Sequence, residues 1–336
     1  MIPGVCSHFN AWVDPQELTD LYVMGYRMAR IDAMQCDDST ALSMVADTKN
    51  AGFAVIVVLA DPERIRLLAP LLDRHDVVEC ENEQDGDWWA MYRGLAMWPA
   101  TYRELLEQFC EVGLELGVNI GGPTCSNTNE KCIRWATTVR DGGWPKGMSH
   151  LTWHSYDPHE NTKFAEMETL SDGMPIIISE WGIPCGDGIT EEEQAKRAVT
   201  IRQRYAKYYA DCWFQIHDGD GHQGREDHYG LLAHNEYRWK PVAYAIPKET
   251  TMLEIHPALR RSEAMPHPTR PGYKTSPHPD KDGTVLCVEF DRVMGKHHIA
   301  KRPAGTAGAW ETWRDDGQKA VFEDTEGGAV AILLVD

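Results

Sequence analysis

The sequence predicts an α/β protein built as a (β/α)8 TIM barrel with a small C-terminal all-β appendage. Eight short β-like runs recur along roughly the first 220 residues, and helical patterns lie between them. The runs are apolar throughout rather than alternating, as in Ala54–Leu59, which is typical of parallel strands buried on both faces. The length of 336 residues suits one barrel of about 250 residues plus an appendage.

The expected strands follow one another at a regular rhythm, each apolar in its body and polar or ionisable near its end. An open doubly wound sheet would want a glycine-rich phosphate loop after its first strand, and none is present, so the eight units favour a closed barrel. In chain order the expected strands are Gly4–His8, Tyr26–Asp32, Phe53–Leu59, Asp76–Asn82, Val118–Gly121, His150–His154, Pro175–Glu180 and Asp211–Ile216.

Helix start and stop signals lie between these runs. An Asp-Pro pair opens two of the helical patterns. Thr190 directly precedes the acidic helical pattern that starts at Glu191, where we expect it to act as the N-cap. Gly52 and Gly117 close two others, since glycine is common just past a helix C-terminus. The expected helices are Pro15–Met24, Thr40–Ala51, Pro62–Arg74, Tyr102–Leu116 and Glu191–Tyr208.

The amino-acid composition of the chain changes after about residue 247. Residues 255–282 are rich in proline, histidine, arginine and lysine, which is typical of a linker or an extended wrap. Short β-like stretches follow, beginning with Thr284–Phe290 and His297–Lys301. We therefore expect the barrel over residues 1–250, a linker or extended wrap over 251–282, and a small β appendage over 283–336.

Composition argues against several kinds of partner. The formal net charge of −19 repels phosphate backbones, so we expect no nucleic acid partner. No run of 18 apolar residues occurs, so we expect no membrane span. The nine cysteines are scattered without CxxC pairs, as reduced thiols are. With no signal peptide visible, the chain as it stands is expected to be cytoplasmic, although removal of a signal peptide, or release by lysis, would leave the same appearance.

Ionisable side chains gather where the expected strands end, which is where barrels of this kind carry their functional residues. Glu83 follows the fourth strand and Glu180 ends the seventh. A buried carboxylate is costly unless it is paired or used, so the alternative here is a structural ion pair. Cleavage of a glycosidic bond needs two carboxyl groups, one as proton donor and one as nucleophile, about 5–5.5 Å apart for retention.

Several motifs at these strand ends, taken in order over residues 4–245, resemble those of the clan A glycoside hydrolases, in particular the cellulase-type and β-xylosidase/iduronidase-type families. In that clan an arginine ends strand two, an Asn-Glu pair ends strand four, a His-x-Tyr ends strand six, and a nucleophile turn ends strand seven. The matching residues here are Arg30, Glu79-Cys-Glu-Asn82-Glu83, His154-Ser-Tyr156 and Ser179-Glu180-Trp-Gly182, with Tyr229-Gly-Leu-Leu and Lys240-Pro241 resembling later segments.

The resemblance implies a retaining glycoside hydrolase that acts on a β-linked oligo- or polysaccharide. Glu83 would be the general acid/base, with a raised pKa, and Glu180 would be the nucleophile that forms a covalent glycosyl-enzyme. One departure is Glu81, which stands where an aromatic residue often precedes Asn-Glu and adds a carboxylate beside Glu83. A non-catalytic carbohydrate-binding protein on a degenerate barrel, and a transglycosylase, are the alternatives.

The resemblance also implies five substrate-binding or orienting residues. Asn82 would hydrogen-bond the sugar 2-hydroxyl, Tyr156 would orient the nucleophile, and Arg30 would keep the nucleophile ionised. His154 and Trp213 would line the sugar subsite, with the indole as a stacking floor. The alternatives are a solvated salt bridge for Arg30 and ordinary core packing for His154 and Trp213. We expect no cofactor and assign no metal.

Overall fold

The computed structural model describes residues 1–7, 14–85, 97–156, 163–186, 188–218, 228–233 and 238–248, together with four strands nearer the C-terminus. The chain divides into two compact units, Met1–Thr250 and Thr251–Asp336, each of which is described by itself. No helix within these described residues is long and apolar enough to cross a membrane.

The first unit is a closed barrel of eight parallel strands, which confirms the predicted fold class. The barrel closes because β1 pairs in parallel with both β2 and β8, for example through Gly4, which lies opposite Met28 on one side and Cys212 on the other. The strands are β1 (Ile2–Cys6), β2 (Met28–Asp32), β3 (Ala54–Leu59), β4 (Val77–Cys80), β5 (Asn119–Cys125), β6 (Met148–Ser155), β7 (Ile176–Trp181) and β8 (Ala210–Trp213).

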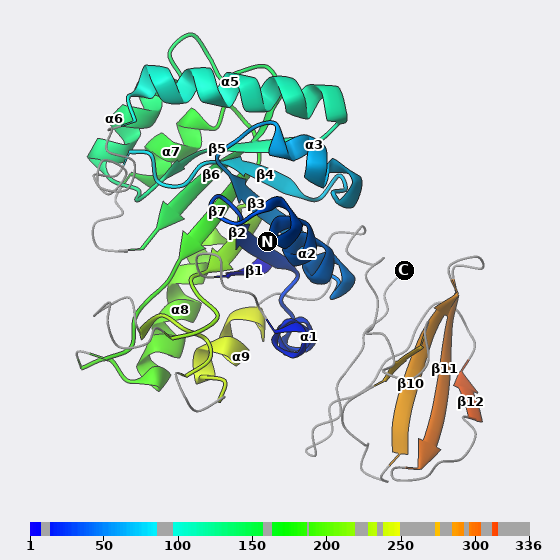
Figure 1. The fold of residues 1–336 in the computed structure, drawn as a ribbon. Helices are drawn as coiled ribbons and strands as arrows, with labels where there is room; N and C mark the ends of the chain where they lie inside the picture. The colour runs from blue at the N-terminus through cyan, green and yellow to red at the C-terminus, as the bar shows by residue number, and fades with distance from the viewer. Residues whose placement is uncertain are drawn as a thin grey trace. The chain divides into compact units, whose positions relative to one another are not determined.

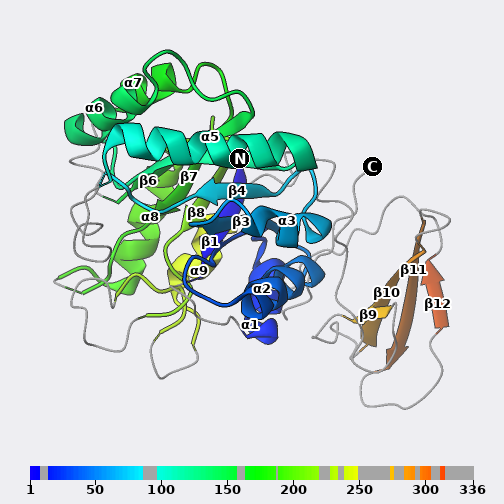
Figure 2. The same cartoon turned by 45° about the horizontal axis from the view of Figure 1, so that its top comes forward.

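Helices surround the strands, as Figures 1 and 2 show, and α5 lies along the outside of β4 and β5. Every expected helix is present, although the one expected over residues 62–74 is a short α-helix followed by a 3-10 turn. The helices of this unit are α1 (Pro15–Met24), α2 (Asp38–Asn50), α3 (Arg64–Leu68), η1 (Ala69–Leu71), α5 (Pro99–Leu116), α6 (Glu130–Val139), α7 (Phe164–Leu170), α8 (Glu191–Tyr205) and α9 (Pro241–Lys248).

Local sequence signals account for the helix ends. Asp14 caps α1 and forms a capping box with Glu17, because each side chain accepts from the other residue's backbone N–H. Gly25 ends the same helix with φ of 114°, a conformation that glycine adopts at no steric cost. Thr190 caps α8 by accepting from the backbone N–H of Glu193. These caps set where α1 begins and ends and where α8 begins.

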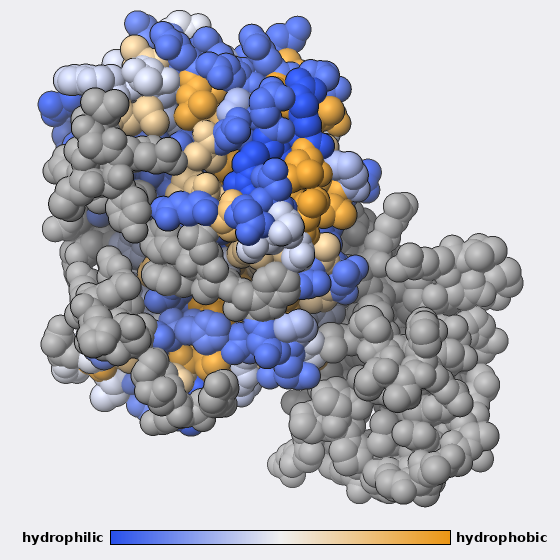
Figure 3. Space-filling model, viewed as in Figure 1, coloured by the Kyte–Doolittle hydropathy of each residue, from blue (hydrophilic) through white to orange (hydrophobic). Residues whose placement is uncertain are grey.

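The apolar core lies between the strands and the helices. Val55, Val57 and Leu59 alternate along β3 and belong to one buried cluster with helix residues such as Leu21 and Phe109. The described surface seen in Figure 3 is largely hydrophilic, with small separate apolar patches. The eight cysteines of the described barrel residues are all free thiols.

The second unit contains a four-stranded antiparallel sheet in the order β12-β11-β10-β9. The strands are β9 (Tyr273–Thr275), β10 (Thr284–Asp291), β11 (Lys296–Pro303) and β12 (Glu311–Arg314). Strand β9 lies inside the range expected to be a linker, where it pairs with β10, so the sheet begins earlier than composition indicated. The rest of the range 251–282, and the segment 315–336, lie outside the described residues.

Candidate active site

Six of the seven predicted site residues lie at the C-terminal ends of four barrel strands. Arg30 belongs to β2, His154 to β6 and Glu180 to β7, whereas Glu83 follows the end of β4. Side chains from strands that are not neighbours touch one another here, so they point into the barrel mouth. The structure therefore brings six of the seven predicted residues together, and Trp213 is the exception.

Arg30 is the centre of the arrangement. Its Nε donates to Glu79 Oε2 at 2.5 Å, its Nη1 donates to Glu180 Oε1, and its Nη2 donates to Asn82 Oδ1 at 2.7 Å. The Arg30 side chain is 4% exposed, so it is not the solvated salt bridge that the sequence left open. One guanidinium thus joins β2 to the ends of β4 and β7.

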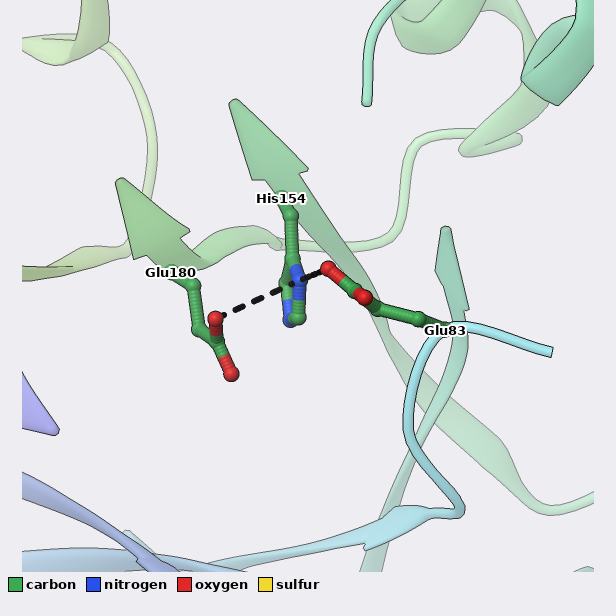
Figure 4. A group of neighbouring side chains, drawn as sticks. All are labelled: Glu83, His154 and Glu180. Atoms are coloured by element: carbon green, nitrogen blue, oxygen red, sulfur yellow. Dashed lines mark hydrogen bonds and ion pairs between the residues drawn. The ribbon is translucent and has the colours of Figure 1, made fainter. Parts of the chain in front are cut away.

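The two carboxylates lie on either side of His154, as Figure 4 shows. The imidazole Nδ1 lies 2.8 Å from Glu83 Oε1 and 3.5 Å from Glu180 Oε2. One oxygen of each carboxylate and a ring nitrogen of His154 all lie within 4.8 Å of one another. The two carboxylates therefore approach each other more closely than the spacing that leaves room for a water between two carboxyl groups.

Glu180 accepts hydrogen bonds at both oxygens. Arg30 donates to one and the Tyr156 hydroxyl donates to the other. The Tyr156 ring in turn meets the rings of Phe214 and Tyr229 edge-on, with centroids 5.6 Å and 5.8 Å away. Sequence patterns did not single out Phe214, because it lies just beyond the end of β8 in no recognisable motif.

Burial and charge compete over the ionisation of these groups. Burial raises the pKa of Glu180, and the Glu83 carboxylate adds to this, while His154, Arg30 and the Tyr156 hydroxyl oppose it without cancelling it. Burial lowers the pKa of His154, so the imidazole is neutral at neutral pH. Burial, with the charges of Glu180 and Glu83, raises the pKa of Tyr156 well above its usual range, which keeps its proton available for donation.

Glu79 behaves differently from Glu180. Burial works to raise the pKa of the Glu79 carboxyl, but the charge of Arg30, helped by His154, outweighs it, and the pKa is lowered. The pKa of Arg30 is raised well above its usual value because Glu79 and Glu180 outweigh the effect of its own burial. Arg30 and Glu79 therefore form a permanently charged pair below the mouth.

The loop after β4 holds Glu83 in an uncommon conformation. Glu81 and Glu83 have φ of 63° and 50°, which non-glycine residues seldom adopt, and such residues cluster at functional sites. Asp85 anchors the loop because it accepts from the backbone N–H and the hydroxyl of Ser126, at the end of β5. Since β4 ends at Cys80, Glu81 and Glu83 both lie beyond the strand, and strand alternation does not set how their side chains are oriented.

Trp213 lies in the core in this structure. The side chain is fully buried, its Nε1 donates to the backbone oxygen of Tyr229 at 2.8 Å, and its ring meets Trp181 edge-on at 4.8 Å. No indole surface is open for a sugar to stack on. The placement favours core packing, the alternative that the sequence left open for this residue.

A metal ion has one candidate position in the described part of the chain. Glu83, His154 and Glu180 are the only group there whose donor atoms have ligand spacing. Their donors suit a zinc-like ion, yet the contact between Nδ1 and Glu83 already joins two of the three. The hydrogen bond between His154 and Glu83, together with those that Glu180 accepts from Arg30 and Tyr156, accounts for the same geometry with no ion.

Comparison with known proteins supports the fold. No protein-family model and no curated protein matches the chain in sequence. Among solved structures, an endo-β-1,3-glucanase of family GH128 from Pseudomonas viridiflava is 14% identical, with a TM-score of 0.54 over 73% of this chain and 96% of its own. A GH30 endoxylanase from Clostridium papyrosolvens is 13% identical, with a TM-score of 0.53 over 91% and 81%.

A third similar structure is a mutant form of Cel5A from Thermotoga maritima in complex with cellobiose. It is 16% identical, with a TM-score of 0.51 over 72% of this chain and 95% of its own. The structural neighbours are thus glycoside hydrolases, as the strand-end motifs indicated. At these identities the likeness establishes a shared barrel fold.

Proposed function

We propose that this protein is a retaining glycoside hydrolase that cleaves a β-linked oligo- or polysaccharide by double displacement. The observation that carries the proposal is the approach of a Glu83 oxygen to within 4.8 Å of a Glu180 oxygen, at the C-terminal mouth of the barrel. Two carboxyl groups at that spacing can act on one anomeric carbon from opposite sides. The glycoside hydrolase neighbours support the same class of activity.

In the first step, a Glu180 oxygen attacks the anomeric carbon and forms an ester bond as the glycosidic bond breaks. Protonated Glu83 transfers its proton to the leaving oxygen, so the first product departs as a neutral alcohol. In the second step Glu83, now ionised, takes a proton from water, whose oxygen attacks the anomeric carbon. The ester bond breaks, and Glu180 regains its negative charge.

The surrounding residues serve these two carboxylates. Because Arg30 can only donate, Asn82 must turn its carbonyl oxygen toward it, which leaves the amide nitrogen to donate to the sugar 2-hydroxyl. Tyr156 holds the attacking carboxylate in place, and neutral His154 lies against the acid. Phe214 is itself buried and packs edge-on against Tyr156, so it supports the residue that holds the nucleophile.

A mechanism-based 2-fluoro glycoside tests the proposal directly. It should inactivate the protein stoichiometrically, with the label on Glu180, and Glu180→Ala should abolish turnover of aryl glycosides. β-Glucans and xylan are suitable first polysaccharides, since the similar structures include a glucanase and a xylanase. A label on another residue would reject the assignment of the nucleophile.

The alternatives give different results in the same assays. A carbohydrate-binding protein on a degenerate barrel would retain oligosaccharide affinity in Glu83→Gln and Glu180→Gln, and the unmodified protein would cleave nothing. A transglycosylase would be labelled at Glu180, yet with an added sugar acceptor it would release longer oligosaccharides in preference to hydrolysis products.

A further inference from the structure

Glu79 is a buried carboxylate that the two-step mechanism leaves without a role. Its side chain is fully buried on β4, and Arg30 Nε lies 2.5 Å from its Oε2. Arg30 therefore has two carboxylate partners, Glu79 on one edge of the guanidinium and Glu180 on another. Only Glu180 takes part in bond making.

The charge count around Arg30 changes during the reaction. In the resting site, two carboxylates face one guanidinium. When Glu180 attacks the anomeric carbon, its carboxylate becomes a neutral ester, so the guanidinium loses the charge of that partner. A buried cation without a counter-ion is strongly unfavourable, and Glu79 is placed to prevent that state.

Glu79 also limits how far Arg30 neutralises the nucleophile. A guanidinium with Glu180 as its sole partner would hold that carboxylate more tightly and reduce its reactivity. With Glu79 bound along the Nε edge, the Arg30–Glu79 pair is close to neutral as a unit, and Glu180 keeps more of its negative charge. The same contact fixes the guanidinium plane, because Arg donors form a rigid fork.

We propose that Glu79 is a positioning residue that keeps Arg30 paired throughout the catalytic cycle, and so supports both the attack by Glu180 and the glycosyl-enzyme. This inference rests on the proposed glycosidase function. It deepens that function by assigning a third carboxylate, one that never touches the substrate.

The test is Glu79→Gln, which keeps the shape of the side chain and removes its charge. We expect kcat/KM to fall about 30-fold or more, because Glu180 becomes a weaker nucleophile and its ester leaves Arg30 unpaired. The acid limb of the pH–rate profile should move to lower pH by about one unit, because removal of a nearby negative charge favours ionised Glu180. Labelling by the 2-fluoro glycoside should slow, while release of the label should slow much less.

Asp211→Asn is the matched control. Asp211 pairs with Arg202 as deeply as Glu79 pairs with Arg30, with both side chains at most 2% exposed, and it lies near the start of β8. Loss of this buried pair should lower the melting temperature without moving the acid limb. If Glu79→Gln behaves in the same way, Glu79 is a structural ion-pair partner and the inference is wrong.

Failure of the inference is distinguishable from failure of the proposed function. If the unmodified protein is labelled at Glu180 and turns over, but Glu79→Gln leaves the acid limb and the labelling rate unchanged, only the inference falls. If the unmodified protein neither turns over nor is labelled, the glycosidase proposal falls first. Should Glu79→Gln not fold, Glu79→Asp keeps the charge at shorter reach. Glu79→Asp should then lower kcat while leaving the acid limb within a few tenths of a pH unit of its normal position. An acid limb that moves to lower pH by about one unit, as expected for loss of the charge, would overturn the inference.

Discussion

The Tyr156 hydroxyl donates a hydrogen bond to Glu180, on the carboxylate oxygen that Arg30 does not occupy. A donor at this position favours the ionised carboxylate, so it opposes the effect of burial on the pKa of Glu180. The Tyr156 donor lowers the pKa of Glu180, whereas by our inference the negative charge of Glu79 raises it. Substitutions at the two residues should therefore move the acid limb of the pH–rate profile in opposite directions.

Tyr156→Phe should move the acid limb of kcat/KM to higher pH, because the ionised form of Glu180 loses a donor. We expect kcat/KM at the pH optimum to fall roughly 10- to 100-fold, the effect of one hydrogen bond to a charged group. Initial rates across pH 4–8 on an aryl glycoside provide the measurement. A limb that moves to lower pH would show that Tyr156 does not stabilise the ionised nucleophile.

Glu180→Gln should make the folded protein more stable at neutral pH. Burial raises the folded-state pKa of Glu180 above its unfolded value, so ionised Glu180 destabilises the fold once the pH rises through the folded pKa. Below the unfolded value the carboxyl is protonated in both states, and the difference disappears. We expect the melting temperature to rise by roughly 2–4 °C at pH 7 and by much less near pH 4.

Glu115→Gln is the control for that measurement. Glu115 forms an exposed pair with Arg66, and pairs of this kind contribute little to stability. Its melting temperature should stay close to that of the unmodified protein at both pH values. A lower melting temperature for Glu180→Gln at pH 7 would mean that Glu180 stabilises the fold as a structural ion-pair partner, which is the alternative that the sequence left open.

Trp213→Phe separates core packing from sugar binding. The substitution removes the hydrogen bond to the Tyr229 carbonyl oxygen and part of the contact with Trp181. We expect the free energy of unfolding to fall by about 1–3 kcal/mol, with KM changed less than about twofold. Phe214→Leu, in contrast, removes a ring that packs against Tyr156 and should lower kcat several-fold. A raised KM in Trp213→Phe with unchanged stability would return the stacking role to Trp213.

The sequence predicted the barrel because both of its signals are local. Apolar runs such as Ala54–Leu59 identify strands buried on both faces, and caps such as Asp14 and Gly117 identify helix ends. The predicted boundaries were least accurate where the chain leaves regular secondary structure. Strand β4 ends at Cys80, earlier than expected, because Glu81 turns into a left-handed conformation that no composition rule marks.

The candidate site was predictable as a set of strand ends, but the contacts within it were not. Glu79 stood inside a recognised pattern, yet nothing in the pattern says that its partner is Arg30, 49 residues away in the chain. Trp213 and Phe214 are neighbours in sequence, and only the three-dimensional structure shows that the first faces the core and the second lies against Tyr156. In both cases the surroundings of the side chain depend on residues far away in the sequence, which local patterns do not identify.

Asn82→Ala tests whether the contact between Arg30 and Asn82 prepares a donor for the substrate. Since Arg30 occupies the carbonyl oxygen of Asn82, the amide nitrogen is the group that can donate to a sugar 2-hydroxyl in the transition state. Loss of one such donor typically costs about 10²- to 10³-fold in kcat. A 2-deoxy glycoside should suffer a similar loss with the unmodified protein, and combining the two changes should cost little more than either alone. Fully additive losses would show that Asn82 acts by holding Arg30 rather than by contacting the sugar.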